Sequence, residues 1–309
     1  MKRILLGGLL LFPLLSHACD VCGIYLGIQP HDRTSSVSVL YRFRYLEGLM
    51  PGAPVLKHGD HSAATGPQYY REFLQTVEFR GEYWLGQRFS LMASVPVVNN
   101  YQSVEGVVMA DIYGAGDPFV LARWIAVNTK CLTDEERTVH RIMVGGGLKM
   151  PVGASDLRWN GQLVDHDIQP GSGTMDGLLS LQYLIRHGRT GAGLASIGRF
   201  NTASTGGYQM GHGINLTAEA FHRFDIQKVQ LMPALGAYME HTLPDAYKEG
   251  EVEGTGGTTW FLHTGARAWW KAWALGINYQ FALAHDIGIL MVPDHSRFIV
   301  GLTYNINTY

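Results

Sequence analysis

Two cysteines near the start of the chain have a spacing that suits redox or metal chemistry. Cys19 and Cys22 form a CxxC motif, and Gly23 follows it. Two thiolates at this spacing can close into a strained disulfide or bind a soft ion such as copper(I) or zinc. Haem attachment needs a histidine directly after the second cysteine, so the glycine excludes it. The motif leaves a disulfide and a metal site as alternatives.

Two histidines in a later polar segment are candidate helpers for such a metal. His58 and His61 lie close together in that segment, and Cys131 adds a third thiol far along the chain. Imidazole and thiolate are the usual ligands of zinc. A pair of histidines in a polar loop is more often simply solvated. We therefore expect no cofactor for the main activity and keep copper or zinc handling as an alternative.

The first 18 residues have the pattern of a secretory signal peptide. Lys2 and Arg3 precede an apolar run from 4 to 15, and Ser16 and Ala18 are the small residues of a cleavage site. Cys19 would then begin the mature chain, which leaves lipidation of Cys19 as an alternative. The sequence predicts an exported protein.

The composition excludes several classes of function. Charged residues make up 16% of the chain, against roughly 25% in an average soluble domain. The net charge of −2 gives no reason to expect a nucleic-acid partner. After residue 18 no apolar run reaches the roughly 20 residues of a membrane helix. Any membrane span must therefore be built from strands.

Polar and apolar residues alternate over long segments. In 76–85, Val77 and Phe79 fall on one face of an extended chain, and Glu78 and Arg80 fall on the other. Twelve segments show this pattern: 35–46, 70–84, 88–99, 114–128, 139–152, 172–187, 190–203, 207–223, 227–242, 257–270, 272–285 and 296–308. Short turns, as at Gly86, alternate with long polar connections such as 47–69, 100–113 and 153–171.

This arrangement predicts an antiparallel transmembrane β-barrel of about 12 strands in the outer membrane of a Gram-negative bacterium. Long loops would be extracellular and short turns periplasmic. A periplasmic β-sandwich is the alternative, but globular strands average only about 5–6 residues. The expected organisation is a signal peptide (1–18), a periplasmic or lumenal segment able to act as a plug (19–34) and the barrel (35–309). The expected partners are the lipid bilayer and, since the chain ends on Tyr309, the barrel-assembly machinery.

The glycine-rich stretch VGGGLKMPVG, residues 144–153, has a structural interpretation. A phosphate-binding loop needs Ser or Thr after its lysine and a helix behind it, whereas Met150 follows Lys149 here. Gly145 and Gly147 instead share the inward phase of a strand with Lys149. We expect these glycines to leave room for a neighbouring side chain or a solute.

The inward phase of the predicted strands carries charges of both signs. The candidates for lining the lumen are Arg42, Arg44, Glu78, Arg80, Glu82, Arg123, Arg141, Lys149, Asp176, Arg186, Glu219 and Arg267. The inward phase also includes Arg223, Lys228, Glu240 and His263. Rows of opposite charge on the inner wall neutralise one another, and their side chains narrow the lumen of a 12-stranded barrel. Asp117 and Asp176 lie in glycine-rich turns at the outer rim, where they either gate the pore or cap loop backbone.

Four motifs in order carry a resemblance to a known family. They are SLMASVP (90–96), YGAGDP (113–118), GGGLKMPVG (145–153) and IQPGSGTMD (168–176). Together they resemble the outer-membrane channel proteins associated with the phenol meta-cleavage pathway, which are similar in style to the long-chain fatty acid transporter. The resemblance implies a barrel that takes up small, often aromatic or apolar, solutes passively.

The sequence thus predicts a non-enzymatic channel for small-molecule solutes. The first alternative is an outer-membrane protein that handles or senses copper or zinc through the CxxC motif. The second is an outer-membrane lipid hydrolase, for which Ser196 and His212 are in phase, although no local motif surrounds them. A nucleophile of that kind needs a base and an orienting group held together.

Overall fold

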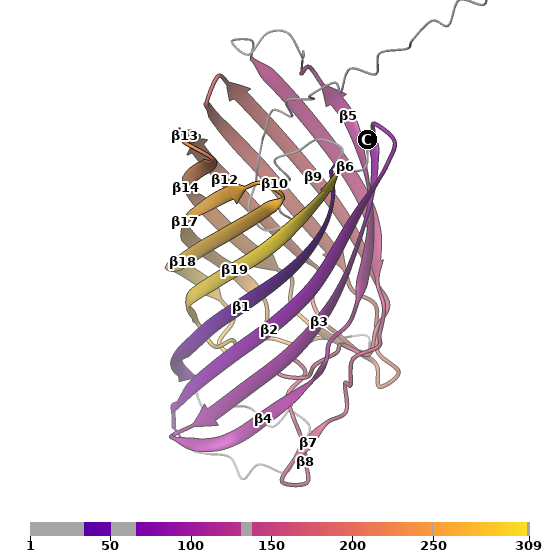
Figure 1. Ribbon diagram of the computed structural model, residues 1–309. Helices are drawn as coiled ribbons and strands as arrows, with labels where there is room; N and C mark the ends of the chain where they lie inside the picture. The colour runs from indigo at the N-terminus through magenta and orange to yellow at the C-terminus, as the bar shows by residue number, and fades with distance from the viewer. Residues whose placement is uncertain (1–33, 51–65, 131–137, 249, 308–309) are drawn as a thin grey trace, which may run out of the picture.

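The protein is a closed antiparallel β-barrel in a computed structural model that describes residues 34–50, 66–130, 138–248 and 250–307. Its main sheet has 14 strands, of which β4 and β13 only extend hairpins, so twelve form the wall (Figure 1). They are β1 (Thr34–Met50), β2 (Gln68–Leu85), β3 (Phe89–Val104), β5 (Phe119–Asn128), β6 (Val139–Lys149), β9 (Asp176–His187), β10 (Thr190–Phe200), β12 (Gly213–His222), β14 (Val229–Thr242), β17 (Gly257–Trp270), β18 (Trp273–Ile287) and β19 (Asp294–Asn307).

Pairing between the first and last strands closes the barrel. β1 pairs with β19 from Thr34 opposite Asn307 to Leu46 opposite Asp294. Closure leaves the wall without a free edge strand. The predicted 12-stranded antiparallel barrel is confirmed. Within the described residues, no helix is long and apolar enough to cross a membrane. The predicted signal peptide and nearly all of segment 19–34 lie outside those residues.

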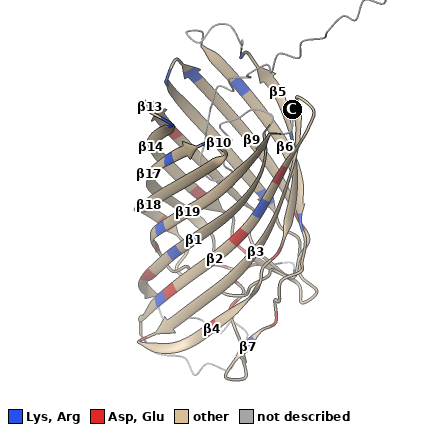
Figure 2. Ribbon diagram, in the orientation of Figure 1, with Lys and Arg blue, Asp and Glu red and all other residues tan. Residues whose placement is uncertain are grey.

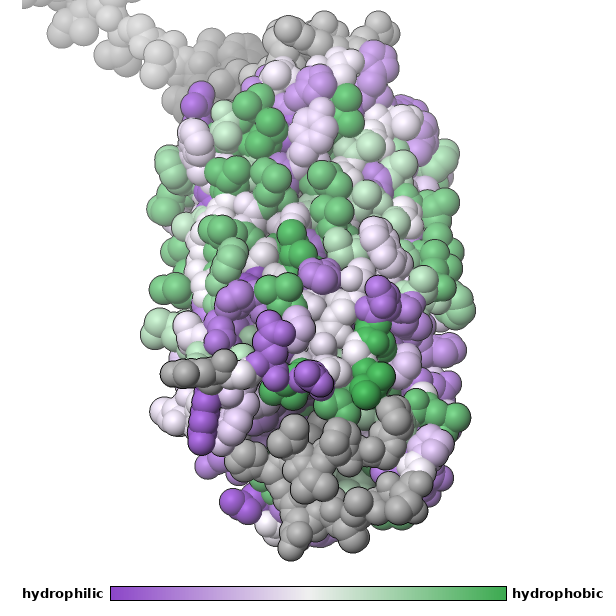
Figure 3. All heavy atoms as spheres, turned by 180° about the vertical axis from the view of Figure 1, so that it is seen from behind, coloured by the Kyte–Doolittle hydropathy of each residue, from purple (hydrophilic) through white to green (hydrophobic). Residues whose placement is uncertain are grey.

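The outer surface is apolar because alternate side chains point away from the lumen. On β2, Phe79 is 52% exposed, whereas its neighbour Glu78 is 1% exposed. Figure 3 shows hydrophobic side chains over much of one face, with hydrophilic side chains gathered towards its lower end. Exposed apolar surface on this scale is favourable only against lipid. The predicted phase of the strands is confirmed.

The inside of the barrel near the short turns is filled by side chains. One buried cluster joins Leu184, Phe221, Met232 and Trp269 from four strands. A second consists of Trp84, Ile125 and Met143. These clusters narrow the lumen at the end that we call the turn end, where the chain passes from β17 to β18 and from β9 to β10.

The predicted segment boundaries were wrong around the second connection. Residues 100–113 were expected to form a polar loop, but β3 continues to Val104 and pairs there with β4 (Val107–Ala115). The turn between them is Glu105-Gly106, and both residues have positive φ. The predicted strand 114–128 is therefore divided, and β5 begins at Phe119. Polar side chains above the apolar band do not stop backbone pairing.

The opposite end, which we call the loop end, carries additional small sheets. Strands β7 (Arg158–Trp159) and β8 (Gln162–Leu163) form a hairpin, and β11 (Tyr208–Gln209), β15 (Ala246–Tyr247) and β16 (Gly250–Glu251) form a three-stranded sheet. The strands predicted to begin at 172 and 207 therefore begin only at Asp176 and Gly213. Short β13 (Phe224–Ile226) pairs with β14 at the turn end.

The segment 150–175, which we call the docked loop, packs onto the inner side of β4. Val164 and Ile168 from this loop form a buried cluster with Ala110 and Ile112 of β4. The amide of Asn100 on β3 donates a hydrogen bond to the carbonyl of Ile168 at 2.8 Å. The docked loop therefore lies against β3 and β4 at the loop end, and Figure 1 shows its hairpin β7–β8 beside β4.

Candidate transport pathway in the barrel lumen

Two adjoining cavities occupy the lumen. The larger, which we call the loop-side chamber, has a volume of about 430 Å³. The smaller, which we call the turn-side cavity, has a volume of about 90 Å³. Arg42, Arg80 and Ile299 line both of them. These three side chains, on the adjacent strands β1, β2 and β19, lie between the two cavities and belong to the lining of both.

Both cavities have arginines and apolar side chains in their walls, and the turn-side cavity adds several small residues. The turn-side cavity has small groups in its lining, among them Ser36, Ser38 and Gly301, together with three arginines, Glu82 and larger apolar side chains such as Met92 and Trp269. The loop-side chamber combines several arginines with apolar side chains: Leu74, Phe119, Leu121, Leu178, Ile197 and Ile299. A solute in the chamber would contact both cationic and apolar groups.

A buried carboxylate holds the two arginines at the junction of the cavities. Glu78 pairs with Arg42 at 3.0 Å and with Arg80 at 2.6 Å. The Ser94 hydroxyl donates to the same carboxylate at 2.6 Å. Bands of opposite charge alternate along the middle of β2 in Figure 2. These pairs keep the guanidinium groups on the wall, where charge-assisted hydrogen bonds fix their orientation.

A second ion-pair network lies on the wall formed by β1, β14 and β19. Arg44 binds Asp294 through two hydrogen bonds of 2.7 and 2.6 Å. Arg297 contacts the same carboxylate at 2.8 Å and also pairs with Glu240. The Arg297 guanidinium lies 4.4 Å from the centroid of the Phe261 ring, a cation–π distance. Two cations and two carboxylates therefore neutralise each other here.

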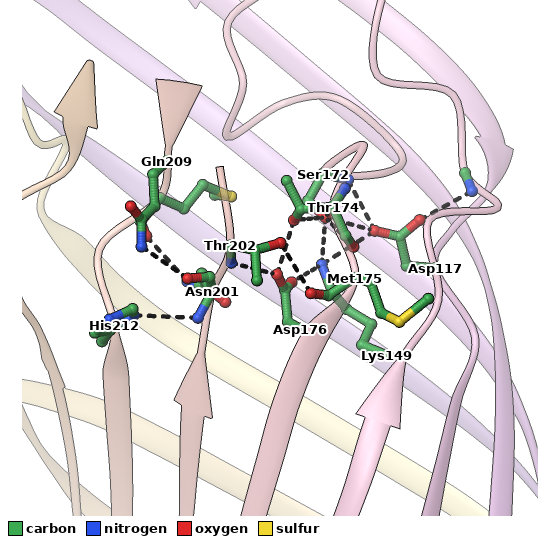
Figure 4. Close-up of polar contacts among 12 residues, drawn as sticks. Asp117, Lys149, Ser172, Thr174, Met175, Asp176, Asn201, Thr202, Gln209 and His212 are labelled. Carbon is green, nitrogen blue, oxygen red and sulfur yellow. Dashed lines mark hydrogen bonds and ion pairs between the residues drawn. The ribbon is translucent and has the colours of Figure 1, made fainter. Parts of the chain in front are cut away.

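A third network joins the lumen wall to the docked loop (Figure 4). The Lys149 ammonium lies 2.5 Å from Asp176 and 3.1 Å from Asp117, and it also donates to the Ser172 hydroxyl. Asp117 accepts hydrogen bonds from the backbone N–H groups of Gly153 at 2.9 Å and Ser172 at 2.8 Å. The two aspartates that were predicted at the rim thus hold loop backbone.

The same network lowers the pKa of one loop carboxyl group. Burial alone would raise the pKa of Asp117, but the N–H groups of Ser172 and Gly153 and the Lys149 ammonium together hold that pKa below its ordinary value. Asp176 accepts hydrogen bonds from the Thr174 hydroxyl at 2.8 Å and from the Thr202 N–H at 3.0 Å. Asp117 and Asp176, which both pair with Lys149, therefore hold the backbone at Gly153, Ser172 and Thr202 together.

The glycines of 145–153 permit close approach between neighbouring backbones. A β-carbon on Gly145 would lie 2.6 Å from the Ser180 hydroxyl and 2.8 Å from Arg123 Cγ. One on Gly147 would lie 2.2 Å from the Val120 carbonyl oxygen. The space that the glycines leave is filled by neighbouring protein groups.

The other predicted lumen residues lie nearer the turn end. Arg123 and Glu82 form an ion pair in which both side chains are 2% exposed. Arg141, Arg186 and Glu219 are also buried. Arg267 lines the turn-side cavity, and its guanidinium lies 5.8 Å from the Trp269 ring.

Three charged residues of the chamber were missing from the predicted set. Arg199 and Arg297 line the chamber, and Asp294 supports it. The period-two phase of their strands would have found the arginines, since Arg199 follows Ile197 and Arg297 precedes Ile299 on the inner face. Asp294 was assigned to a loop because the expected strand began two residues later.

The predicted metal ligands cannot be placed. Cys19, Cys22, His58 and His61 lie outside the described residues, as does Cys131. Within the described ranges, no group of three or more His, Cys, Asp or Glu side chains could hold a metal ion. The copper or zinc alternative stays a prediction.

The proposed hydrolase pair is not brought together by the strand register. Ser196 on β10 lies opposite Leu216 of β12, while His212 precedes the first residue of that strand. The Nδ1 atom of His212 accepts a hydrogen bond from the backbone N–H of Asn201 at 3.1 Å. A base must lie within hydrogen-bond reach of its nucleophile, so this alternative loses its candidate residues.

Comparison with solved structures places the barrel among outer-membrane proteins. No protein-family model matches the sequence, and no curated protein matches it either. The structure resembles the COG4313 outer membrane channel from Pseudomonas putida F1, with a TM-score of 0.61 and 13% identity. The match covers 88% of this chain and 95% of that one. This is the fold of an outer-membrane β-barrel.

More distant outer-membrane barrels also align with the chain. The β domain of the Bordetella autotransporter BrkA has a TM-score of 0.43 at 12% identity, covering 89% of this chain and 100% of that one. A Pseudomonas aeruginosa FadL homologue has a TM-score of 0.40 at 10% identity, covering 89% and 90%.

Proposed function

We propose that this outer-membrane barrel is a passive channel for small solutes. The observation that carries the proposal is that the two cavities share Arg42, Arg80 and Ile299 in their linings, so they lie next to each other along the lumen. In this proposal a solute passes these side chains on its way from the loop-side chamber to the turn-side cavity. The similar COG4313 structure, which is described as a channel, supports the same role. In this proposal the loop end faces the outside and the turn end faces the periplasm.

Selectivity would come from the width and lining of the lumen, with no catalytic step. The turn-side cavity, at about 90 Å³, is the narrower space and limits the size of a solute. The apolar side chains of the loop-side chamber favour solutes with an aromatic or aliphatic part. This preference agrees with the uptake of small aromatic or apolar compounds that the family resemblance implies. The link to a phenol pathway is part of the proposal and rests on that resemblance.

A tryptophan placed in the narrow cavity tests the proposal. Gly301 lines the turn-side cavity, and the nearest atoms to an added β-carbon there are those of Leu40, 3.5 Å away. Gly301→Trp should therefore fill the path and lower single-channel conductance in planar bilayers to a small fraction of its original value. Gly81→Trp is the matched control, because Gly81 shares the lipid-facing phase of β2 and has nothing within 4 Å of an added β-carbon.

These conductance measurements distinguish an open channel from a barrel that does not conduct. The control should keep the original conductance and the original rate of liposome swelling with small neutral solutes. Equal conductance in the two tryptophan variants would show that solutes do not pass the turn-side cavity. A purified protein that folds and inserts but carries no current and gives no swelling would contradict the channel function itself.

A further inference from the structure

We propose that the loop-side chamber contains a binding site for small amphiphilic organic anions, with Arg199 as the group that binds the carboxylate. This inference deepens the channel proposal by naming the solute class. Arg199 lines the chamber from β10. Within the described part of the chain its side chain makes no ion pair and no hydrogen bond, and its Nε atom is buried without a partner.

The charges that surround Arg199 are already committed to other cations. Glu240 is close enough to interact with Arg199 electrostatically, but Arg297 and Arg44 pair with that carboxylate. Arg199 is half-buried, and burying its Nε–H group without an acceptor is costly, so a ligand anion would supply the missing interaction. Gly213 lies opposite Arg199 on β12, where a β-carbon would lie 3.2 Å from an Nη atom.

The whole chamber has a surplus of positive charge. Six cationic side chains line it against three carboxylates: Glu78, Asp117 and Glu240. Asp176 and Asp294 pair with Lys149 and Arg44 and bring the balance to six cations against five anions. Arg199 is the cation of the chamber that forms no ion pair with any of these five carboxylates. In the ring of strands, β10 lies across the barrel from β1, which carries Arg42.

The apolar part of the lining indicates what else the ligand carries. Phe119 and Leu178 line the chamber, as does Ile197, which lies on the same face of β10 as Arg199. The volume of about 430 Å³ falls within the range of roughly 300–1,000 Å³ typical of small-molecule sites. An aromatic or short aliphatic monocarboxylate has one charge for Arg199 and an apolar body for these side chains.

Benzoate and its neutral analogue benzamide test this site. Binding of each to the full-length protein in detergent is measured by calorimetry at low salt, where screening is weak. Benzoate should bind the original protein, and Arg199→Gln should weaken its binding about tenfold, the scale of one charge-assisted interaction. Benzamide should bind weakly to both. Arg199→Lys should keep part of the affinity, and Arg158→Gln in the exposed β7–β8 hairpin should change nothing.

Channel recordings give a second reading of the same site. Benzoate should reduce the KCl current at a lower concentration than benzamide, and this difference should disappear in Arg199→Gln. Equal binding of the two probes, or unchanged benzoate binding in Arg199→Gln with its β-barrel circular dichroism intact, would overturn the anion site. An absence of current in every variant would overturn the channel proposal alone, because calorimetry decides the site without conduction.

Discussion

Removal of the Lys149 cation is the most direct test of the network that holds the docked loop. The variant Lys149→Met keeps the length and volume of the side chain and removes the charge. Asp176 and Asp117 would then face each other without the ammonium that lies 2.5 and 3.1 Å from them. We expect the docked loop to open more often, while the barrel itself stays closed.

The magnitude follows from burial and from the bonds that remain. Removing one partner of a fully buried ion pair costs about 3–5 kcal/mol. Lys149 is 21% exposed, and Asp117 keeps its hydrogen bonds from the Gly153 and Ser172 N–H groups, so both facts reduce the cost. We expect about 2 kcal/mol for local opening of the loop. Since each 1.4 kcal/mol is about a factor of ten, opening should become about 30-fold more frequent.

Hydrogen exchange followed by mass spectrometry measures this opening directly. Peptides that span 150–175 should exchange about 30-fold faster in Lys149→Met, while those from β17 and β18 should not change. Lys228→Met, at the turn end between β13 and β14, is the control for loss of a positive charge. Unchanged exchange of 150–175 in Lys149→Met would refute the conclusion that this lysine holds the loop.

Three further predictions concern the same wall and loop. The pKa of Asp117 is lower in the folded loop than in an unfolded chain. The ionised Asp117 carboxylate therefore stabilises the loop fully above about pH 4, and this stabilisation is lost as the pH falls through the pKa of the folded state. Hydrogen exchange of 150–175, corrected for the intrinsic exchange rate, should rise only in that acid range. Gly147→Val should lower the melting temperature sharply, whereas Gly146→Val should not, because an added β-carbon meets an atom at 2.2 Å in the first and none nearer than 3.9 Å in the second. Arg123→Met should lower the free energy of unfolding in urea by about 3–5 kcal/mol, and adding Glu82→Leu should recover most of that loss; a double variant no more stable than Arg123→Met alone would contradict this pairing.

The barrel was predictable because alternation is a local property of the chain. Glu78 and Phe79 are neighbours in sequence, yet one is buried and the other exposed, as the period of two requires. The phase alone also indicated which charges face inward. The same reasoning missed the part of β3 that continues to Val104 and pairs with β4. The residues there are largely polar, and a strand can continue beyond the lipid without alternating polar and apolar residues.

The roles of the charged residues were not predictable in the same way. Lys149, Asp117 and Asp176 lie in three separate motifs, and only the docked loop brings them together. The phase of β10 would have shown that Arg199 faces inward, but not that the described carboxylates leave it unpaired. Which cation binds which anion depends on strands that are distant in the chain.

The sequence by itself determined the strand count, the lipid-facing surface and the inward position of the charges, because each follows from alternation between neighbouring residues and from the exclusion of polar backbone from lipid. Only the tertiary structure decided the ion-pair networks, the docked loop and the division of the lumen into two cavities. These depend on register and on closure of β1 against β19, which set the distances between side chains across the barrel.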